Sequence, residues 1–118
     1  MWSSLGPPPR HDELEVTVIG PGHGESVLVH LGDGQWLVVD SCTDPSDGGR
    51  VPAPLKYLRA LGVDVEVAVK VVVISHWDDD HVRGIAEVVR ACSRAKLCCS
   101  IGLTEREFNK LVERISVG

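Results

Sequence analysis

The sequence predicts an α/β fold, more closely an α+β layered sandwich in which helices pack on a mixed sheet. Three strand-like segments come first, and helix-like and strand-like segments alternate after them. Strands joined by a helical crossover run parallel, so the later strands should be parallel and the early ones antiparallel. The 118 residues suffice for one domain with a buried core.

The first three strands are expected at residues 14–19, 26–31 and 35–40. The first alternates apolar and polar residues, and the other two are nearly continuous apolar runs. The sequence Gly-Asp-Gly at 32–34 is a turn signal, so the second and third strands should form an antiparallel hairpin. His30, inside the second strand, is expected to be structural.

A surface loop rich in Gly, Pro and Asp is expected at 44–54. A short helix should follow, with Pro54 in its first position and Gly62 at its end. Residues 63–70 are ambiguous, because they alternate like a strand, while Asp64 could cap one helical turn. We favour the turn.

The second half of the chain should contain a buried strand ending at Ser75, a helix, a strand at 96–101 and a last helix. A capping box at 104–107 opens the last helix. Each helix has apolar residues at helical spacing on one face. These residues are Ile85, Val88, Val89 and Cys92 in the first helix, and Phe108, Leu111, Val112 and Ile115 in the second.

Composition narrows the function classes. Lys and Arg number 12 against 17 Asp and Glu, for a net charge of -5, and no basic run resembles a nucleic-acid footprint. An acidic protein can still approach phosphates through divalent cations. The chain has no stretch of about 20 apolar residues and no signal-peptide core, so we expect a cytoplasmic protein without membrane contact. Residues 1–12, with three prolines, should form a flexible leader before a domain at 13–118.

The four cysteines Cys42, Cys92, Cys98 and Cys99 do not form a Cys-x-x-Cys pair. The last two lie in an apolar, strand-like run. We therefore expect buried free thiols rather than a disulfide or a zinc knuckle.

The strongest functional signal is the sequence His-Trp-Asp-Asp-Asp-His at 76–81, directly after the apolar run 71–74. Such a run suits a strand buried on both faces, and the change to polar residues marks its exit from the core. In an extended turn, positions 76, 78, 80 and 81 converge, and mixed imidazole and carboxylate ligands suit zinc, iron or manganese. A solvated acidic turn with two incidental histidines is the alternative, but it does not explain why the histidines bracket the acids.

This segment resembles the signature of the metallo-β-lactamase superfamily, whose usual form is His-x-His-x-Asp-His after a hydrophobic strand. Here Asp78 replaces the second histidine. Residues 18–26 and 38–42 resemble the opening strands of that family, its glycine turn and its hairpin ending in an acid. The His-x-Asp-x-Asp-His variant is similar to that of the hydrolase domain in ComEC-type DNA-uptake proteins. The resemblance thus implies the N-terminal half of an αββα sandwich and phosphodiester chemistry.

By the same resemblance, His76 and Asp78 hold a first metal, and Asp80 and His81 hold a second. Asp80 also orients the attacking water and is the predicted catalytic residue. The expected cofactor is Zn²⁺, two ions in the complete domain, with Mn²⁺ as an alternative.

Two further residues are candidates for supporting roles. Asp40 could orient a ligand or the signature loop by hydrogen bonds, or could be an ordinary carboxylate at a strand end. His23 lies in a glycine-rich turn that lacks the Lys-Ser/Thr ending of a phosphate-binding loop, so it either borders the substrate or is simply exposed.

The sequence has no histidine after His81 and no aspartate after Asp80. The family takes its remaining metal ligands from the half of the domain that follows the signature. We therefore expect a C-terminal half-domain, a second subunit or a homo-oligomer to complete the site, and one apolar face to be left uncovered. The expected function is a metal-dependent phosphodiesterase or nuclease. The alternatives are a non-catalytic metal-binding or protein-interaction module and a thioester or acyl hydrolase.

Overall fold

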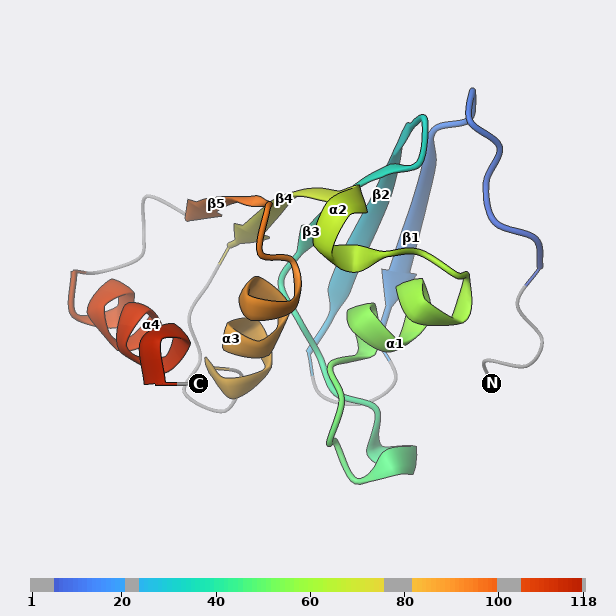
Figure 1. Cartoon of the computed structure of the whole chain (residues 1–118). Coiled ribbons are helices and arrows are strands. Elements are labelled where there is room, and N and C mark those ends of the chain that lie inside the picture. Colours follow the sequence, from blue (N-terminus) through green and yellow to red (C-terminus); the bar gives the residue numbers. More distant parts are fainter. Residues whose placement is uncertain (1–5, 21–23, 76–81, 100–104, 118) are drawn as a thin grey trace.

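The computed structural model describes residues 6–20, 24–75, 82–99 and 105–117. In these residues a five-stranded sheet, with strand order β1-β2-β3-β4-β5, carries helices on one side (Figure 1). The strands are β1 (Glu15–Ile19), β2 (Ser26–Gly32), β3 (Gln35–Val39), β4 (Val69–Ile74) and β5 (Lys96–Cys99). The helices are η2 (Pro45–Asp47), α1 (Ala53–Ala60), α2 (Val65–Ala68), α3 (Val82–Ala91) and α4 (Glu105–Val117).

The sheet is mixed, as the order of elements predicted. β1, β2 and β3 pair antiparallel, whereas β3, β4 and β5 pair parallel through crossovers that contain the helices. The predicted hairpin joins β2 and β3, and Gly32, Asp33 and Gly34 all have positive φ. Glycine adopts this left-handed backbone without strain, which explains the turn signal in the sequence. The α+β fold class is therefore confirmed.

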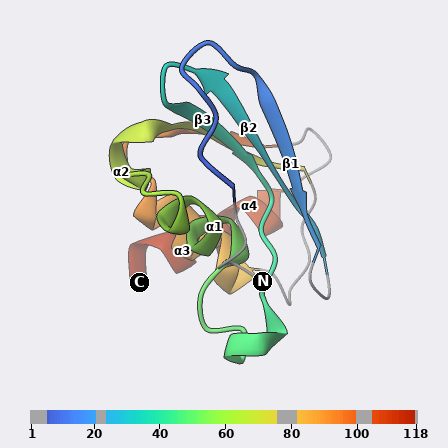
Figure 2. The ribbon, with the colours of Figure 1, turned by 90° about the vertical axis from the view of Figure 1, so that its right-hand side faces the viewer.

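The helices cover one face of the sheet (Figure 2). α1 packs against β2, α2 contacts α1 and β4, and α3 packs against β4 and α4. Leu111 of α4 joins Ile74 and Ile85 in a small apolar cluster beside the main core. The buried residues of the main core are Ile19, Leu28, Trp36, Val38, Cys42, Ala53, Leu55, Tyr57, Leu58, Val65, Val69, Val72, Val88 and Cys92.

The other face of the sheet is also apolar, and in the described part of the chain no helix lies over it (Figure 2). Strand pairing aligns its side chains in two rows across all five strands. One row is Val18, Val27, Val39, Val73 and Cys98, and the other is Val16, Val29, Leu37, Val71 and Lys96. We call these ten residues the open face. An antiparallel sheet with one solvated face normally alternates apolar and polar residues, so this sheet has the composition of one buried on both sides.

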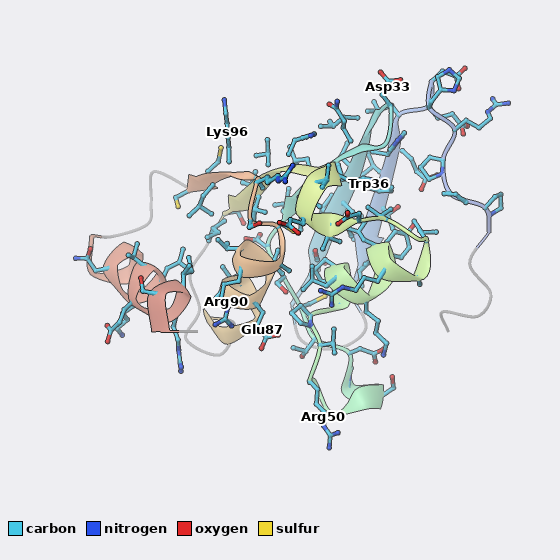
Figure 3. The ribbon with its side chains drawn as sticks, viewed as in Figure 1. Asp33, Trp36, Arg50, Glu87, Arg90 and Lys96 are labelled. Carbon is cyan, nitrogen blue, oxygen red and sulfur yellow. The ribbon has the colours of Figure 1, made fainter. Side chains whose placement is uncertain are left out.

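The open face is accessible to solvent at its β1 side. Val16 and Val18 are 60% and 64% exposed, and Leu14, next to the strand, is 72% exposed. Lys96, at the β5 side, points away from the helices (Figure 3). The part of the chain that the structure describes thus leaves an apolar face uncovered, as the sequence led us to expect.

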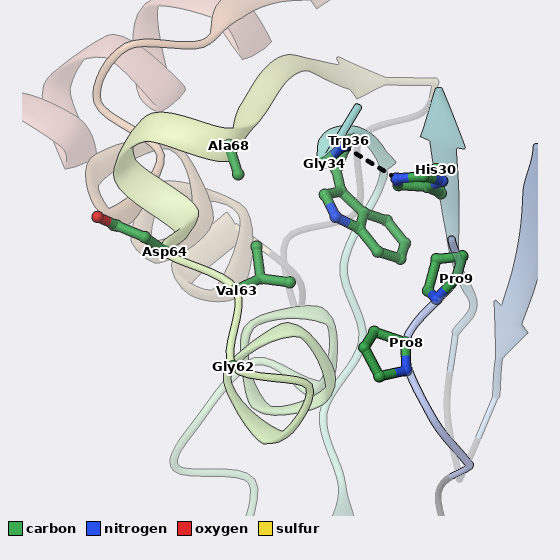
Figure 4. Close-up of a pocket in the computed structure, with 9 residues that line it drawn as sticks. All are labelled: Pro8, Pro9, His30, Gly34, Trp36, Gly62, Val63, Asp64 and Ala68. Atoms are coloured by element: carbon green, nitrogen blue, oxygen red, sulfur yellow. Dashed lines mark hydrogen bonds between the residues drawn. The ribbon is translucent and has the colours of Figure 1, made fainter. Parts of the chain in front are cut away.

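His30 lies in β2, next to the β2–β3 hairpin turn (Figure 4). Its Nδ1 lies 2.7 Å from the Glu13 carbonyl oxygen, and the Gly34 N–H donates to its Nε2 at 3.2 Å. Because a carbonyl only accepts, Nδ1 must carry the hydrogen, and both ring nitrogens are used. The ring also packs against Trp36 above a pocket of about 260 Å³ that Pro8 and Pro9 help to line. His30 is therefore structural, as expected.

Most predicted boundaries agree with the structure to within one or two residues. Residues 65–68 form the favoured helical turn, α2, although the Asp64 side chain makes no capping hydrogen bond. α1 begins one residue before Pro54, and Gly62 follows its end with φ +82°. The capping box at 104–107 begins outside the described residues. In the described segments no helix is long and apolar enough to cross a membrane.

Three expectations about burial were wrong. Cys98 and Cys99 are exposed, because β5 lies at the edge of the sheet beside the open face. Val112 is 42% exposed, since the contact of α4 with the core is centred on Leu111. Asp44, assigned to a surface loop, is buried: its carboxylate accepts a hydrogen bond from the Ser46 N–H and pairs with the Lys56 ammonium at 3.3 Å.

Candidate functional site

The predicted metal ligands fall between two described elements. His76, Asp78, Asp80 and His81 lie outside the described residues, as does His23, so the structure does not place them. We call residues 76–81 the cluster. The structure does place the residues on both sides of it, at the end of β4 and at the start of α3. Within the described segments no group of three His, Cys, Asp or Glu residues could hold a metal ion.

Asp40 connects the end of β3 to the residue that precedes the cluster. Its Oδ1 accepts a hydrogen bond from the Ser75 N–H at 2.8 Å, and its Oδ2 accepts one from the Ser75 hydroxyl. Its own N–H donates to the Val73 carbonyl oxygen at 2.8 Å. Because β3 and β4 are parallel, both strand ends meet at one edge of the sheet, where this carboxylate fixes the direction in which the chain enters the cluster.

Asp40 itself is held in an unusual backbone conformation. Its φ is +58°, a left-handed value that aspartate tolerates better than most residues. The Ser26 hydroxyl, at the start of β2, donates to its carbonyl oxygen at 3.1 Å. Hydrogen bonds of this one residue therefore connect the start of β2 and the ends of β3 and β4.

Ser41 follows Asp40 and is nearly buried, with 5% of its surface exposed. Among the described residues its Oγ has no hydrogen-bond partner. A Cβ placed on Gly84, in the first turn of α3, would lie 3.4 Å from this oxygen. The Ser41 side chain therefore lies against the helix that continues from the cluster.

The sequence pattern indicated Asp40 as a supporting residue but gave no role to Ser26, Ser41 or Ser75. The signal in the sequence was that these three serines lie at or next to the ends of predicted strands, as Asp40 does. Serine is common at strand ends in general, so this signal gains meaning only when the pairing of β2, β3 and β4 is known.

The sequence model of the metallo-β-lactamase superfamily matches residues 19–108. This chain belongs to the metallo-β-lactamase superfamily. Neither a curated protein nor a solved structure gives a significant match. Membership indicates a metal-dependent hydrolase at the level of the superfamily, whose members generally bind zinc.

The donor set of this superfamily member fits such a metal. Two imidazoles and two carboxylates occupy positions 76, 78, 80 and 81, between β4 and α3. Zinc takes both ligand types, and a larger share of carboxylate also suits manganese. The carboxylate of Asp40 holds Ser75, the residue directly before these positions.

The thiols of Cys42 and Cys92 are poor candidates for additional ligands. Burial raises the pKa of each from 9.0 to about 11, and the Asp44 carboxylate adds to the effect at Cys42. Metals bind the thiolate, which is scarce near neutral pH at such pKa values. Both cysteines therefore belong to the core rather than to the site.

These pKa values predict selective alkylation. With iodoacetamide at pH 8 the folded chain should be modified at the exposed Cys98 and Cys99, while Cys42 and Cys92 should react only after unfolding. Folding raises the pKa of the buried Cys42 and Cys92 thiols. The stability that these two neutral thiols contribute is therefore complete below pH 9 and is lost as the pH rises from 9 toward 11. Peptide mass spectrometry checks the labelling. Rapid modification of Cys42 in the folded chain would contradict it.

Proposed function

We propose that this chain is the ligand-bearing half of a metal-dependent phosphodiesterase or nuclease. The observation that carries the proposal is the His-x-Asp-x-Asp-His sequence between β4 and α3, preceded by a serine that the Asp40 carboxylate holds. The variant with Asp78 resembles the ComEC-type hydrolase domain, which favours a phosphodiester over a β-lactam as substrate. Zn²⁺ is the proposed cofactor, with Mn²⁺ as the alternative.

Four residues of the cluster have proposed roles. His76 and Asp78 hold one metal ion, and Asp80 and His81 hold the other. When bound, such a pair of ions activates water and stabilises the charge that develops on a phosphoryl oxygen. Asp80 also accepts a hydrogen bond from the attacking water and so orients it toward phosphorus. Asp40 positions the chain that carries these ligands.

The open face supports completion of the site by a second sheet. Nine of its ten residues are valine, leucine or cysteine, and the one charged residue, Lys96, lies on the edge strand β5. Two sheets that pack face to face interdigitate such apolar side chains at a separation of about 10 Å. A C-terminal half-domain, a second subunit or a second copy of this chain would supply the sheet and further ligands.

One feature favours a second candidate, a non-catalytic module for metal binding or protein interaction. Asp78 departs from the usual histidine of the superfamily. Such a module would keep the fold without turnover. Hydrolysis of a thioester or another acyl substrate is a third candidate, which a substrate panel separates from the first.

Metal content measured together with hydrolysis tests the proposal. We expect the chain to bind zinc or manganese and Asp80→Ala to weaken this binding by at least about 100-fold, since a ligand is lost. Asp64→Ala is the matched control, because Asp64 is exposed at the start of α2 and away from the cluster. Hydrolysis of bis(4-nitrophenyl) phosphate, with a C-terminal half supplied, should follow the metal content. Metal-free protein without turnover under these conditions would refute the proposal.

A further inference from the structure

A pocket of about 260 Å³ lies at the hairpin end of the sheet, away from the carboxyl ends of β3 and β4. Its walls come from the leader, from the β2–β3 hairpin, and from α2 with the residues just before it. Val63 and Ala68 face the Trp36 ring from one side, and the rings of Pro8 and Pro9 lie on the other (Figure 4). The side chains that meet across the pocket are therefore mostly apolar.

The aromatic wall of the pocket is held in place before any ligand binds. Both ring nitrogens of His30 are hydrogen-bonded, one to the Glu13 carbonyl oxygen and the other to the Gly34 N–H. The His30 and Trp36 rings pack with their centroids 5.1 Å apart and with an angle of 59° between their planes. Fixed aromatic walls of this kind are the surfaces on which proline-rich segments dock.

The leader shows which ligand chemistry this pocket accepts. Pro7 and Pro8 each precede a proline, which restricts both to the extended polyproline II conformation. Within the part of the chain that the structure describes, residues 6–9 make no hydrogen bond or ion pair, so Pro8 and Pro9 lie at the pocket by ring packing alone. Pro8 is exposed and Pro9 only half-buried. The leader thus fills its site in part, and a better ligand can displace it.

The residue after the prolines adds a charge preference. The Arg10 Nε lies 3.5 Å from the Glu13 Oε1 and 3.9 Å from the Asp12 Oδ1. Glu13 remains on the domain when the prolines leave, because its carbonyl oxygen is bound by His30. A ligand with a basic residue in place of Arg10 meets the same carboxylates. Exposed ion pairs add little affinity, so these pairs set the direction of the ligand more than its strength.

We propose that this pocket binds a proline-rich segment of a partner protein, in which two consecutive prolines precede a basic residue, and that the leader occupies the same site as an internal competitor. The prolines of the partner take the places of Pro8 and Pro9 against the wall of His30 and Trp36. A polyproline II segment is already extended when free, so it loses little conformational freedom on binding. A competitor in the same molecule lowers the apparent affinity for the partner by the fraction of molecules in which the site is open.

Titration of the full chain with a peptide tests the proposal. The probe is the acetylated peptide Gly-Pro-Pro-Pro-Arg, the sequence of residues 6–10, and binding is followed by NMR at the Trp36 indole N–H. Pro8→Gly/Pro9→Gly removes the competing rings and should bind the probe at least about 5-fold more tightly than the parent chain. Ala68→Leu places a larger side chain in the pocket and should bind it at least about 10-fold more weakly.

Two controls accompany these variants. Ala60→Leu makes the same change at an exposed position of α1 and should bind the probe as the parent chain does. A peptide with alanine in place of its last two prolines should bind at least about 10-fold more weakly than the probe, because the rings are lost.

Each outcome decides the proposal. Equal binding of the two peptides overturns it, and so does equal affinity of the parent chain and Pro8→Gly/Pro9→Gly. Unchanged binding in Ala68→Leu overturns it as well, because the ligand would then lie elsewhere. No change at the Trp36 indole N–H in any variant, up to the highest soluble concentration of the probe, has the same consequence. Should Ala68→Leu not fold, the leader variant and the two peptides decide.

Discussion

Replacement of Asp40 by alanine is expected to reduce the metal affinity of the chain about 10- to 100-fold and to destabilise the fold by about 2 kcal/mol. The affinity falls because the carboxylate holds both the N–H and the hydroxyl of Ser75, the residue next to the first predicted ligand. Hydrogen bonds to a charged acceptor are stronger than neutral ones, so their loss at the edge of the cluster should be large. Zinc titration and denaturant unfolding of the metal-free chain measure the two effects.

Two control variants separate the causes of this loss. Asp33 also has a positive φ, of 52°, but it lies in the hairpin between β2 and β3. Asp33→Ala therefore carries the cost of alanine in a left-handed conformation, about 1–2 kcal/mol, without a change at Ser75. Asp40→Asn keeps a side chain that tolerates this backbone and one oxygen acceptor, so it should be milder than Asp40→Ala. Equal zinc affinities for Asp40→Ala and Asp33→Ala would show that Asp40 is only a turn residue.

The sequence predicted those parts of the structure that depend on local pattern. The Gly-Asp-Gly turn fixes the β2–β3 hairpin, and helical spacing places Ile85 and Val88 of α3, and Cys92 directly after it, in the core. The apolar run before the cluster is β4, which lies between β3 and β5, although only Val72 and Ile74 of the run are buried and Val71 and Val73 lie on the open face. In each of these cases neighbours in the chain decide the structure, so the pattern alone is sufficient.

Features that depend on contacts between distant segments were not predictable in this way. Cys98 and Cys99 look buried in sequence because they follow apolar residues, yet their exposure depends on β5 being the edge strand. The role of Ser75 needs the parallel register of β3 and β4, which brings residue 40 next to residue 75. The burial of Asp44 could not be predicted, because it depends on the ion pair that its carboxylate forms with Lys56 of α1. The sequence shows which residues are present, but the strand topology decides which residues they contact.

The open face yields the second prediction of large effect. The chain alone should self-associate through this face, and the double variant Val16→Lys/Val18→Lys should weaken association by at least about 100-fold, because an apolar interface would have to bury unpaired charges. Five strands about 4.8 Å apart give an apolar face about 20 Å wide, which a second sheet can cover. Both valines are already about 60% exposed in the single chain, so the variant should keep the stability of the monomer.

The matched control is Val67→Lys/Val112→Lys. These two valines are each 42% exposed and lie on α2 and α4, on the helical side of the sheet. The control adds the same charge to the chain, so a general effect of charge on association would appear equally in both double variants. Sedimentation velocity over a range of concentrations measures the association, and denaturant unfolding checks the fold. A parent chain that stays monomeric at every concentration and unfolds cooperatively would argue that the open face needs no covering sheet. Association lost only in the β1 variant would instead place the contact on the open face, the surface from which a second sheet could complete the metal site.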